Sequence, residues 1–340
     1  MPSDSTKRHQ LRPMNVFVRK GSAAERRYRS MGGVPDLEPE QIAPGLPPTP
    51  AHDLIYHGGK TIPALTFTNF YIAGDSWQAS DIQNIDWALA AAMTEPTLNN
   101  VMAQYFSAVP TSKFMSSQKL PGSGPANFSQ GDVEQLVSQL SGQGKFSGFD
   151  LSSTVFNFML PRGTVLNDDA LPGGIQGGHR VEDRRRGVPE EEEADSRHGL
   201  GGYHGSVLVG GKAIYYAIGV YSEAANGQTN GIPVFDAPWK NVVATFYHEL
   251  NEARTDPDVE QVINGGPSSL LGWTSRQGEE CGDFPVFEAN PLTEVFQEVP
   301  VAGGKTVPVQ FQYSNDDHGP QGPVASPRPP AKTRKHKLVA

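Results

Sequence analysis

The chain has 340 residues, 37% of them hydrophobic, and a formal net charge of −9. This negative charge argues against electrostatic binding of nucleic acid, so we do not expect nucleic acid as a partner. No apolar run approaches the roughly 18 residues that span a bilayer, so no membrane association is expected. The single cysteine, Cys281, excludes an internal disulfide and suits a reducing compartment.

Composition divides the chain into one domain and two tails. Gly and Pro number 37 and 29, about a fifth of the chain, which indicates many loops and disordered ends. Residues 1–50 are basic and then Pro-rich without a sustained period, so we predict a disordered N-terminal tail. We predict a single globular domain over 51–315 and a disordered basic tail over 316–340.

A polar insertion interrupts the predicted domain at 163–202. Within it, three arginines (184–186) stand close to four glutamates (190–193). Opposite charge runs of this kind satisfy each other in water, which favours a solvated insertion over a docking loop. The basic C-terminal tail is interpreted in the same way, as a solubilising segment and not as a binder of nucleic acid or an acidic partner.

The first half of the domain predicts both strands and helices. ALTFTNFYIA (64–73) is aromatic and β-branched, which is typical of a strand. SDIQNIDWALAAAM is predicted as a helix capped by Ser80, and Pro96 begins a second helix, PTLNNVMAQYF. A loop rich in Ser, Pro and Gly follows, then a helix at about 132–140 and a buried strand at 153–160 that ends before Pro161.

The second half adds a hairpin, a long helix and a final strand. SVLVGGKAIYYAIGVY (206–221) predicts two strands joined by Gly210 and Gly211. PWKNVVATFYHELNEARTDPD (238–258) is an amphipathic helix that ends at an acidic turn, and TVPVQFQYS (306–314) alternates as a strand. We therefore predict an α+β fold, a mixed β-sheet with helices packed on it.

The helix over 238–258 carries the chemistry that the sequence suggests. At ~100° per residue one face is apolar, and His248 and Glu252 lie close together roughly opposite it, with Glu249 to one side. The ionisable pair is therefore expected to face solvent or a cleft. The apolar face consists of Val242, Val243, Phe246, Leu250 and Ala253.

HELNE stands where zinc peptidases carry HExxH, in which the two histidines bind zinc and the glutamate acts as general base. The fifth position here is Glu252, a harder ligand that also suits Mn²⁺ or Ca²⁺. A further ligand must come from elsewhere, and His204 is a candidate ligand or supporting group. The acidic candidates in EECGD and TDPD are Glu279, Glu280, Asp283, Asp256 and Asp258.

Two other interpretations compete with a metal site. The helix could be an ordinary surface helix, with Glu249 and Glu252 near Arg254. Cys281 as a nucleophile would need a histidine base nearby, and a lone structural thiol is the favoured interpretation. The chain has no GxSxG motif and no P-loop, and GGIQGG (173–178) lies in the polar insertion, where it indicates flexibility and not phosphate binding.

Several stretches, taken in order, resemble bacterial and fungal relatives of the plant phosphate-induced, EXORDIUM-like proteins. The resemblance covers roughly residues 55–315 and is sharpest in the HE-x-x-EA-x-TDP helix and the following GW…E-x-x-D. The matching stretches are IYHGGK, TFTNFYIAGDSW, STVFNFMLPRGT, GGYHGS, YHELNEARTDP, LGWTSRQGEECGD and VQFQYSN.

The resemblance implies a zinc metallopeptidase-like site in which His248 and Glu252 bind the metal and Glu249 is the base. Glu280 or Asp283 would complete it. The chain departs from the family pattern where cysteines are expected, at Gly202 and Phe284. Plant members are secreted, whereas the single cysteine and the lack of a secretory signal at the N-terminus favour the cytoplasm.

Two functions follow from these patterns. The preferred one is a metal-dependent hydrolase, with zinc as the expected ion and a peptide or protein as the substrate. The alternative is a non-catalytic binding or structural protein of the same fold, in which HELNE is a retained helix or a structural metal site.

Overall fold

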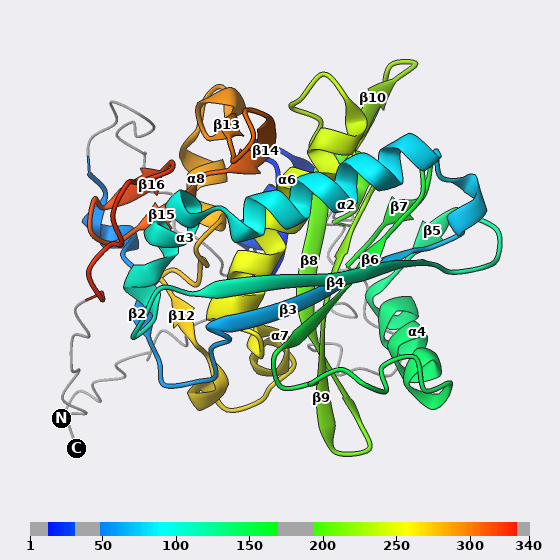
Figure 1. Ribbon diagram of the computed structural model, residues 1–340, viewed down its shortest axis with the longest axis horizontal. Coiled ribbons are helices and arrows are strands. Elements are labelled where there is room, and N and C mark those ends of the chain that lie inside the picture. Colours follow the sequence, from blue (N-terminus) through cyan, green and yellow to red (C-terminus); the bar gives the residue numbers. More distant parts are fainter. Residues whose placement is uncertain (1–12, 31–47, 169–193, 332–340) are drawn as a thin grey trace, which may run out of the picture.

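A computed structural model describes residues 13–30, 48–168 and 194–331 of the chain. Its centre is a mixed sheet (Figure 1), which in order across the sheet contains β1 (Val16–Val18), β8 (Leu200–Val209), β9 (Lys212–Gly219), β6 (Thr154–Met159), β3 (Ala64–Tyr71) and β4 (Thr111–Lys119). β8 runs antiparallel to both its neighbours, whereas β9, β6, β3 and β4 are parallel. The predicted α+β fold with a mixed sheet is confirmed.

Helices cover both faces of this sheet. α2 (Ala79–Thr94) and α6 (Pro238–Thr255) share one core with the strands, and α4 (Gln130–Gly142) shares the other. Side chains of a strand point alternately to its two faces, so Phe67 and Tyr71 of β3 join the α6 core while Phe70 joins the α4 core.

Short elements surround the two cores. The two-stranded ribbons are β2 (Ile55–Tyr56) with β12 (Trp273–Thr274), β5 (Asn127–Phe128) with β7 (Val165–Leu166), β10 (Glu223–Ala225) with β11 (Gln228–Asn230), β13 (Phe296–Pro300) with β14 (Thr306–Gln310), and β15 (Gln312–Ser314) with β16 (Gly319–Gln321). The remaining helices are α1 (Ala23–Ser30), α3 (Pro96–Met102), α7 (Val259–Ile263) and α8 (Asp283–Glu288).

The long elements lie where the sequence predicts them. The strands over 64–73 and 153–160, the hairpin with its turn at Gly210 and Gly211, and the long helix from Pro238 are all confirmed. Ser80 is not the cap of α2, because the helix begins at Ala79 and Gln78 precedes it.

Two predictions in the middle and late chain need correction. The segment expected to be a Ser-, Pro- and Gly-rich loop contains β4, an edge strand paired with β3. All of its residues are exposed or half-buried, so it lacks the apolar alternation that marks a strand. The single strand predicted over 306–314 is divided at Phe311 into β14 and β15, which pair with different partners.

The predicted N-terminal tail is wrong for the part that the structure describes. Val16, Phe17 and Val18 form β1, are at most 1% exposed, and pair with β8. Three apolar residues are too few to show a period, and their partner strand lies far away in the sequence. Residues 1–12 and 31–47 lie outside the described part of the chain.

The predicted C-terminal tail is also partly wrong. β16 pairs with β15, and the backbone amides of Val324, Arg328 and Ala331 donate to carbonyls of 97–104 in and after α3. Backbone pairing of this kind depends on a partner that is distant in the sequence, so it cannot be predicted from composition. The last nine residues, and residues 169–193 of the predicted polar insertion, lie outside the described part.

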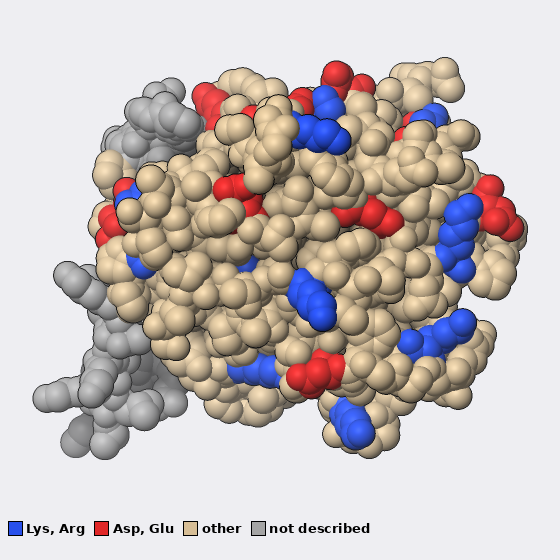
Figure 2. Space-filling view, viewed as in Figure 1, with Lys and Arg blue, Asp and Glu red and all other residues tan. Residues whose placement is uncertain are grey.

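Charges of both signs are interspersed over the face shown in Figure 2, without a large patch of either sign. Among the described helices, none is both long enough and apolar enough to cross a membrane.

Candidate metal centre

The central feature of the candidate site is α6, which is buried on all sides. Pro238 begins the helix at a position that needs no amide hydrogen, and Pro257 follows its end. Every residue from Asn241 to Thr255 is buried. The expectation that His248 and Glu252 face solvent or an open cleft is therefore wrong, since each is 0% exposed. Other elements pack against the polar side of α6 as well as its apolar side.

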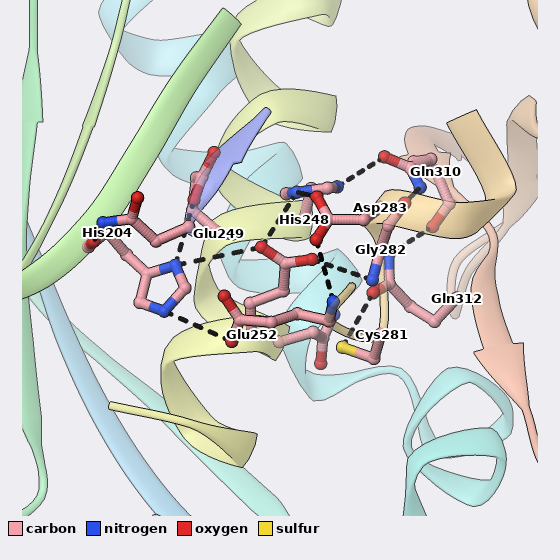
Figure 3. Close-up of polar contacts among 12 residues, drawn as sticks. His204, His248, Glu249, Glu252, Cys281, Gly282, Asp283, Gln310 and Gln312 are labelled. Carbon is pink, nitrogen blue, oxygen red and sulfur yellow. Dashed lines mark hydrogen bonds and ion pairs between the residues drawn. The ribbon is translucent and has the colours of Figure 1, made fainter. Parts of the chain in front are cut away.

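Three elements bring the predicted residues together (Figure 3). α6 supplies His248, Glu249 and Glu252, and β8 supplies His204. Glu280 lies in the turn that leads into α8, and Asp283 is the first residue of that helix. All six of these side chains are at most 1% exposed.

The distances show where each carboxylate lies. His248 Nε2 is 3.0 Å from Glu252 Oε2 and 3.9 Å from Asp283 Oδ1. Glu280 lies on the other side of Glu252, with its Oε1 3.6 Å from His204 Nε2. Of the two carboxylates expected to complete the site, Asp283 is thus the one beside His248.

A glutamine fixes the tautomer of His248. The Nδ1–H of His248 donates to Gln310 Oε1 at 2.7 Å, and the amide nitrogen of Gln310 donates to the carbonyls of Gly282 and Phe311. Because Nδ1 donates to Gln310, the ring nitrogen directed at the carboxylates is Nε2, which lies 3.0 Å from Glu252 Oε2. Histidines that bind metals characteristically have such a partner on the other nitrogen.

His204 is held in a comparable way. Its Nε2 is 3.2 Å from the carbonyl oxygen of Asp256, which only accepts, so Nε2 carries the hydrogen. Burial lowers the pKa of His204 to about 4, so the ring is neutral and Nδ1 presents a lone pair. That atom lies 3.3 Å from Glu249 Oε2 and 3.8 Å from Glu252 Oε2.

The carboxylates lack the partners that buried charges need. Burial, together with repulsion from Glu252, raises the pKa of Glu249, Glu280 and Asp283. His248 Nε2 and Glu252 Oε2 are 3.0 Å apart, yet neither atom makes a hydrogen bond. Buried atoms of this cluster without a hydrogen-bond partner are His248 Nε2, Glu249 Oε1, Glu252 Oε2, Asp283 Oδ1 and both oxygens of Glu280.

These atoms fit a divalent cation. An unpartnered buried polar atom costs about 1–3 kcal/mol, and more when charged, so such a concentration of them is unfavourable without a ligand. Among the described residues, two overlapping sets each offer one donor atom per residue, and the donor atoms of a set lie within 4.8 Å of one another: His248, Glu249 and Glu252, and His204, Glu252 and Glu280. Glu252 belongs to both sets and is the centre of the cluster.

The turn before α8 positions the ligands. The backbone amide of Gly282 donates to Glu252 Oε1 at 2.9 Å, and that of Glu280 donates to Asp283 Oδ2 at 2.8 Å. A Cβ atom on Gly282 would lie 2.3 Å from His248 Nδ1, so only glycine allows this close approach.

The side chains of three acidic candidates lie outside the cluster. Glu279 pairs with His52 at 3.0 Å, and Asp258 accepts from the Ser206 hydroxyl at 3.2 Å. Asp256 accepts from the amide of Gly272 through its side chain and reaches His204 only through its carbonyl. Cys281 is buried, and burial raises the pKa of its thiol, which is consistent with the structural interpretation of that residue.

Sequence reasoning missed Gln310 and the N-terminal segment. Gln310 lies in a predicted strand, but nothing local distinguishes it from Gln312 two residues later. Asn15 Nδ2 donates to the His204 carbonyl, and the ring of Phe17 lies 4.2 Å from that of His248. Both residues are in the segment predicted to be disordered, and only the pairing of β1 with β8 brings them to the cluster.

Comparisons with protein-family models, curated proteins and solved structures each found no match for this chain. The resemblance to EXORDIUM-like proteins therefore stays a prediction, and the cluster is interpreted from its own geometry.

Proposed function

We propose that this protein is a metal-dependent hydrolase of the peptidase type. The observation that carries the proposal is the buried group of His248, Glu249 and Glu252, whose donor atoms lie within 4.8 Å of one another, with Asp283 Oδ1 3.9 Å from His248 Nε2. The mixed set of one imidazole and carboxylates suits Zn²⁺, and its hard oxygen atoms also suit Mn²⁺ or Ca²⁺.

The residues around these ligands have distinct tasks. A divalent cation held here would lower the pKa of water and polarise a carbonyl group. Glu249, whose Oε1 has no hydrogen-bond partner, would take up the proton of the attacking water. His204 touches the other oxygen of Glu249 and orients it, while Gln310 holds His248 in the ligand tautomer.

Metal content tests the binding part of this proposal. Elemental analysis of the protein purified without chelator should find at least one equivalent of a divalent metal, and His248→Ala should lose most of it. His198→Ala is the matched control, because this histidine pairs with Asp195 at a half-exposed position away from the cluster. A metal-free wild-type protein would contradict the proposal.

Hydrolysis tests the catalytic part. Glu249→Gln should retain the metal but lose about 10²–10⁴-fold in the rate of cleavage of a quenched fluorescent peptide library, because the proton acceptor is gone. A structural metal site, the alternative favoured by the complete burial of the cluster, predicts that chelation lowers the melting temperature while Glu249→Gln changes no hydrolysis.

A further inference from the structure

Glu280 is the member of the cluster that the ion of the proposed function does not use. That ion (the first ion) is held by His248 and Glu252 with Asp283 beside them, whereas Glu280 lies on the other side of Glu252. The Glu280 side chain is 0% exposed, and neither of its oxygens has a hydrogen-bond partner. A buried carboxylate in this condition is unfavourable unless a cation binds it, and the first ion does not explain it.

His204 lies on the same side of Glu252 as Glu280. Its Nε2–H donates to the Asp256 carbonyl, so Nδ1 is the nitrogen left to bind an ion. Nδ1 lies 3.8 Å from Glu252 Oε2, and Nε2 of the same ring lies 3.6 Å from Glu280 Oε1. His204, Glu252 and Glu280 each offer one donor atom, and these three atoms lie within 4.8 Å of one another. One imidazole and two carboxylates are therefore available for an ion on this side of Glu252.

Glu252 is the residue that two ions would share. Its Oε1 accepts from the Gly282 amide, whereas its Oε2 is directed at both histidines, 3.0 Å from His248 Nε2 and 3.8 Å from His204 Nδ1 (Figure 3). Two ligand atoms of one tetrahedral zinc ion stand roughly 3.3–3.6 Å apart, because each is about 2.0–2.2 Å from the metal. The two distances lie on either side of this range. Glu252 Oε2 is therefore close enough to share one ion with each histidine.

The charges of the cluster also favour two ions over one. The cluster contains four buried carboxylates, those of Glu249, Glu252, Glu280 and Asp283. Arg254 of the same helix α6 is buried too, but its guanidinium donates to residues of α3 and β4 and not to these carboxylates. Buried charges are stabilised by pairing or by binding a metal. One divalent cation balances two carboxylate charges, so two cations balance all four.

We propose that the cluster binds a second divalent cation, held by His204 and Glu280 and bridged to the first ion by Glu252. This inference rests on the proposed function for the first ion. One imidazole and two carboxylates suit Zn²⁺, and the hard oxygen atoms also suit Mn²⁺. The two ions are expected about 3.5–4 Å apart, as in other two-metal sites.

Zinc stoichiometry of the full chain tests the second site. Wild-type protein equilibrated with Zn²⁺ and freed of excess by gel filtration should hold two equivalents by elemental analysis. Glu280→Gln should hold one, because the amide keeps the shape of the side chain but lacks the charge that binds the ion. Glu260→Gln is the matched control and should hold two, because it makes the same change at a buried glutamate whose hydrogen bonds lie outside the cluster.

Electron paramagnetic resonance of bound Mn²⁺ tests whether the two ions are neighbours. Two Mn²⁺ ions about 3.5–4 Å apart with a shared ligand are magnetically coupled, so wild-type protein with two equivalents should lose the spectrum of isolated Mn²⁺. Glu280→Gln, with its single equivalent, should keep that spectrum. The measurement on wild-type protein needs no variant, so it decides the question even if Glu280→Gln does not fold.

One equivalent of zinc in wild-type protein would overturn the second site and leave the proposed function standing. Two equivalents in Glu280→Gln, or the spectrum of isolated Mn²⁺ in doubly loaded wild type, would also overturn it, because the second ion would then lie elsewhere. A wild-type protein without metal would overturn both proposals. Two coupled ions, combined with unchanged hydrolysis in Glu249→Gln, would support the second site and contradict the hydrolase alone.

Discussion

His248 and His204 show how single residues prepare the cluster. Each ring has one nitrogen committed to an acceptor outside the cluster, Gln310 Oε1 for His248 and the Asp256 carbonyl for His204. The remaining nitrogen of each ring faces the carboxylates of the cluster. This arrangement is costly in a buried place unless a cation completes it.

Gln310 is the residue by which this preparation can be tested. Gln310→Leu leaves the Nδ1–H of His248 without an acceptor and frees the ring to change tautomer, so metal affinity should fall by about 10–100-fold. The measurement is competition with a chromogenic chelator of known affinity.

Gln310→Glu is the conservative counterpart. It keeps an oxygen to accept from His248 Nδ1 and should retain most of the affinity. Equal loss in both variants would show that Gln310 acts only through packing of β14 against α6.

At the level of elements, the site depends on how closely α6 approaches β8. Gly202 and Gly219 lie opposite each other in β8 and β9, beneath Thr245 of α6. A Cβ on Gly202 would lie 2.5 Å from the Ile218 carbonyl oxygen and 3.2 Å from Glu249 Oε1. Because Gly202 lacks a side chain, the helix can bring Glu249 against the strand that carries His204.

Gly202→Ala should therefore push α6 and β8 apart. Overpacking of this kind costs about 1–3 kcal/mol, and here it should also weaken metal binding, because Glu249 and His204 lie on the two elements that separate. Urea unfolding and metal titration give the two readouts.

Gly142→Ala in α4 is the matched control, since its Cβ would meet nothing within 4 Å. Alanine is the better helix former, so stability should stay constant or rise slightly. An unchanged Gly202→Ala protein would contradict the close-approach explanation.

Across the whole molecule, buried carboxyl groups link stability to pH. Glu260 lies outside the cluster, where it accepts from the Ser206 amide, the Tyr216 hydroxyl and the Gln130 side chain. Burial, with repulsion from Glu134 as the next cause, raises the pKa of Glu260 from 4.5 to about 8. The folded state therefore holds a proton that the unfolded state releases between these pH values.

The sign of the effect follows from proton linkage. Because the folded state binds more protons over this interval, the free energy of unfolding should fall as pH rises from about 4.5 to about 8. In Glu260→Gln, this fall in the free energy of unfolding should be smaller by on the order of a few kcal/mol. Urea unfolding of both proteins at several pH values measures the difference.

Glu134→Gln provides a second comparison. Removing the charge of Glu134 lowers the pKa of Glu260. The pH interval over which the free energy of unfolding falls should therefore become narrower. If the difference between wild type and Glu260→Gln does not vary with pH, Glu260 is not the group responsible.

Local pattern was sufficient for the long elements. The periodicity in 64–71, 154–159 and 206–219, and the helix from Pro238 with His248 and Glu252 one turn apart, could be predicted from neighbouring residues alone, whereas the start of β8 at Leu200 lies inside the predicted polar insertion. The choice of Glu280 and Asp283 as acidic candidates came from the same sequence, together with its resemblance to a known family.

Only the tertiary structure decided how these parts meet. The contacts of His248 with Asp283, Gln310 and Phe17, and the contact of His204 with Glu280, all join residues far apart in the chain. Periodicity reports which side of an element is apolar, but it does not report what packs against the polar side. That depends on which strand occupies the sheet edge, a property of the whole fold.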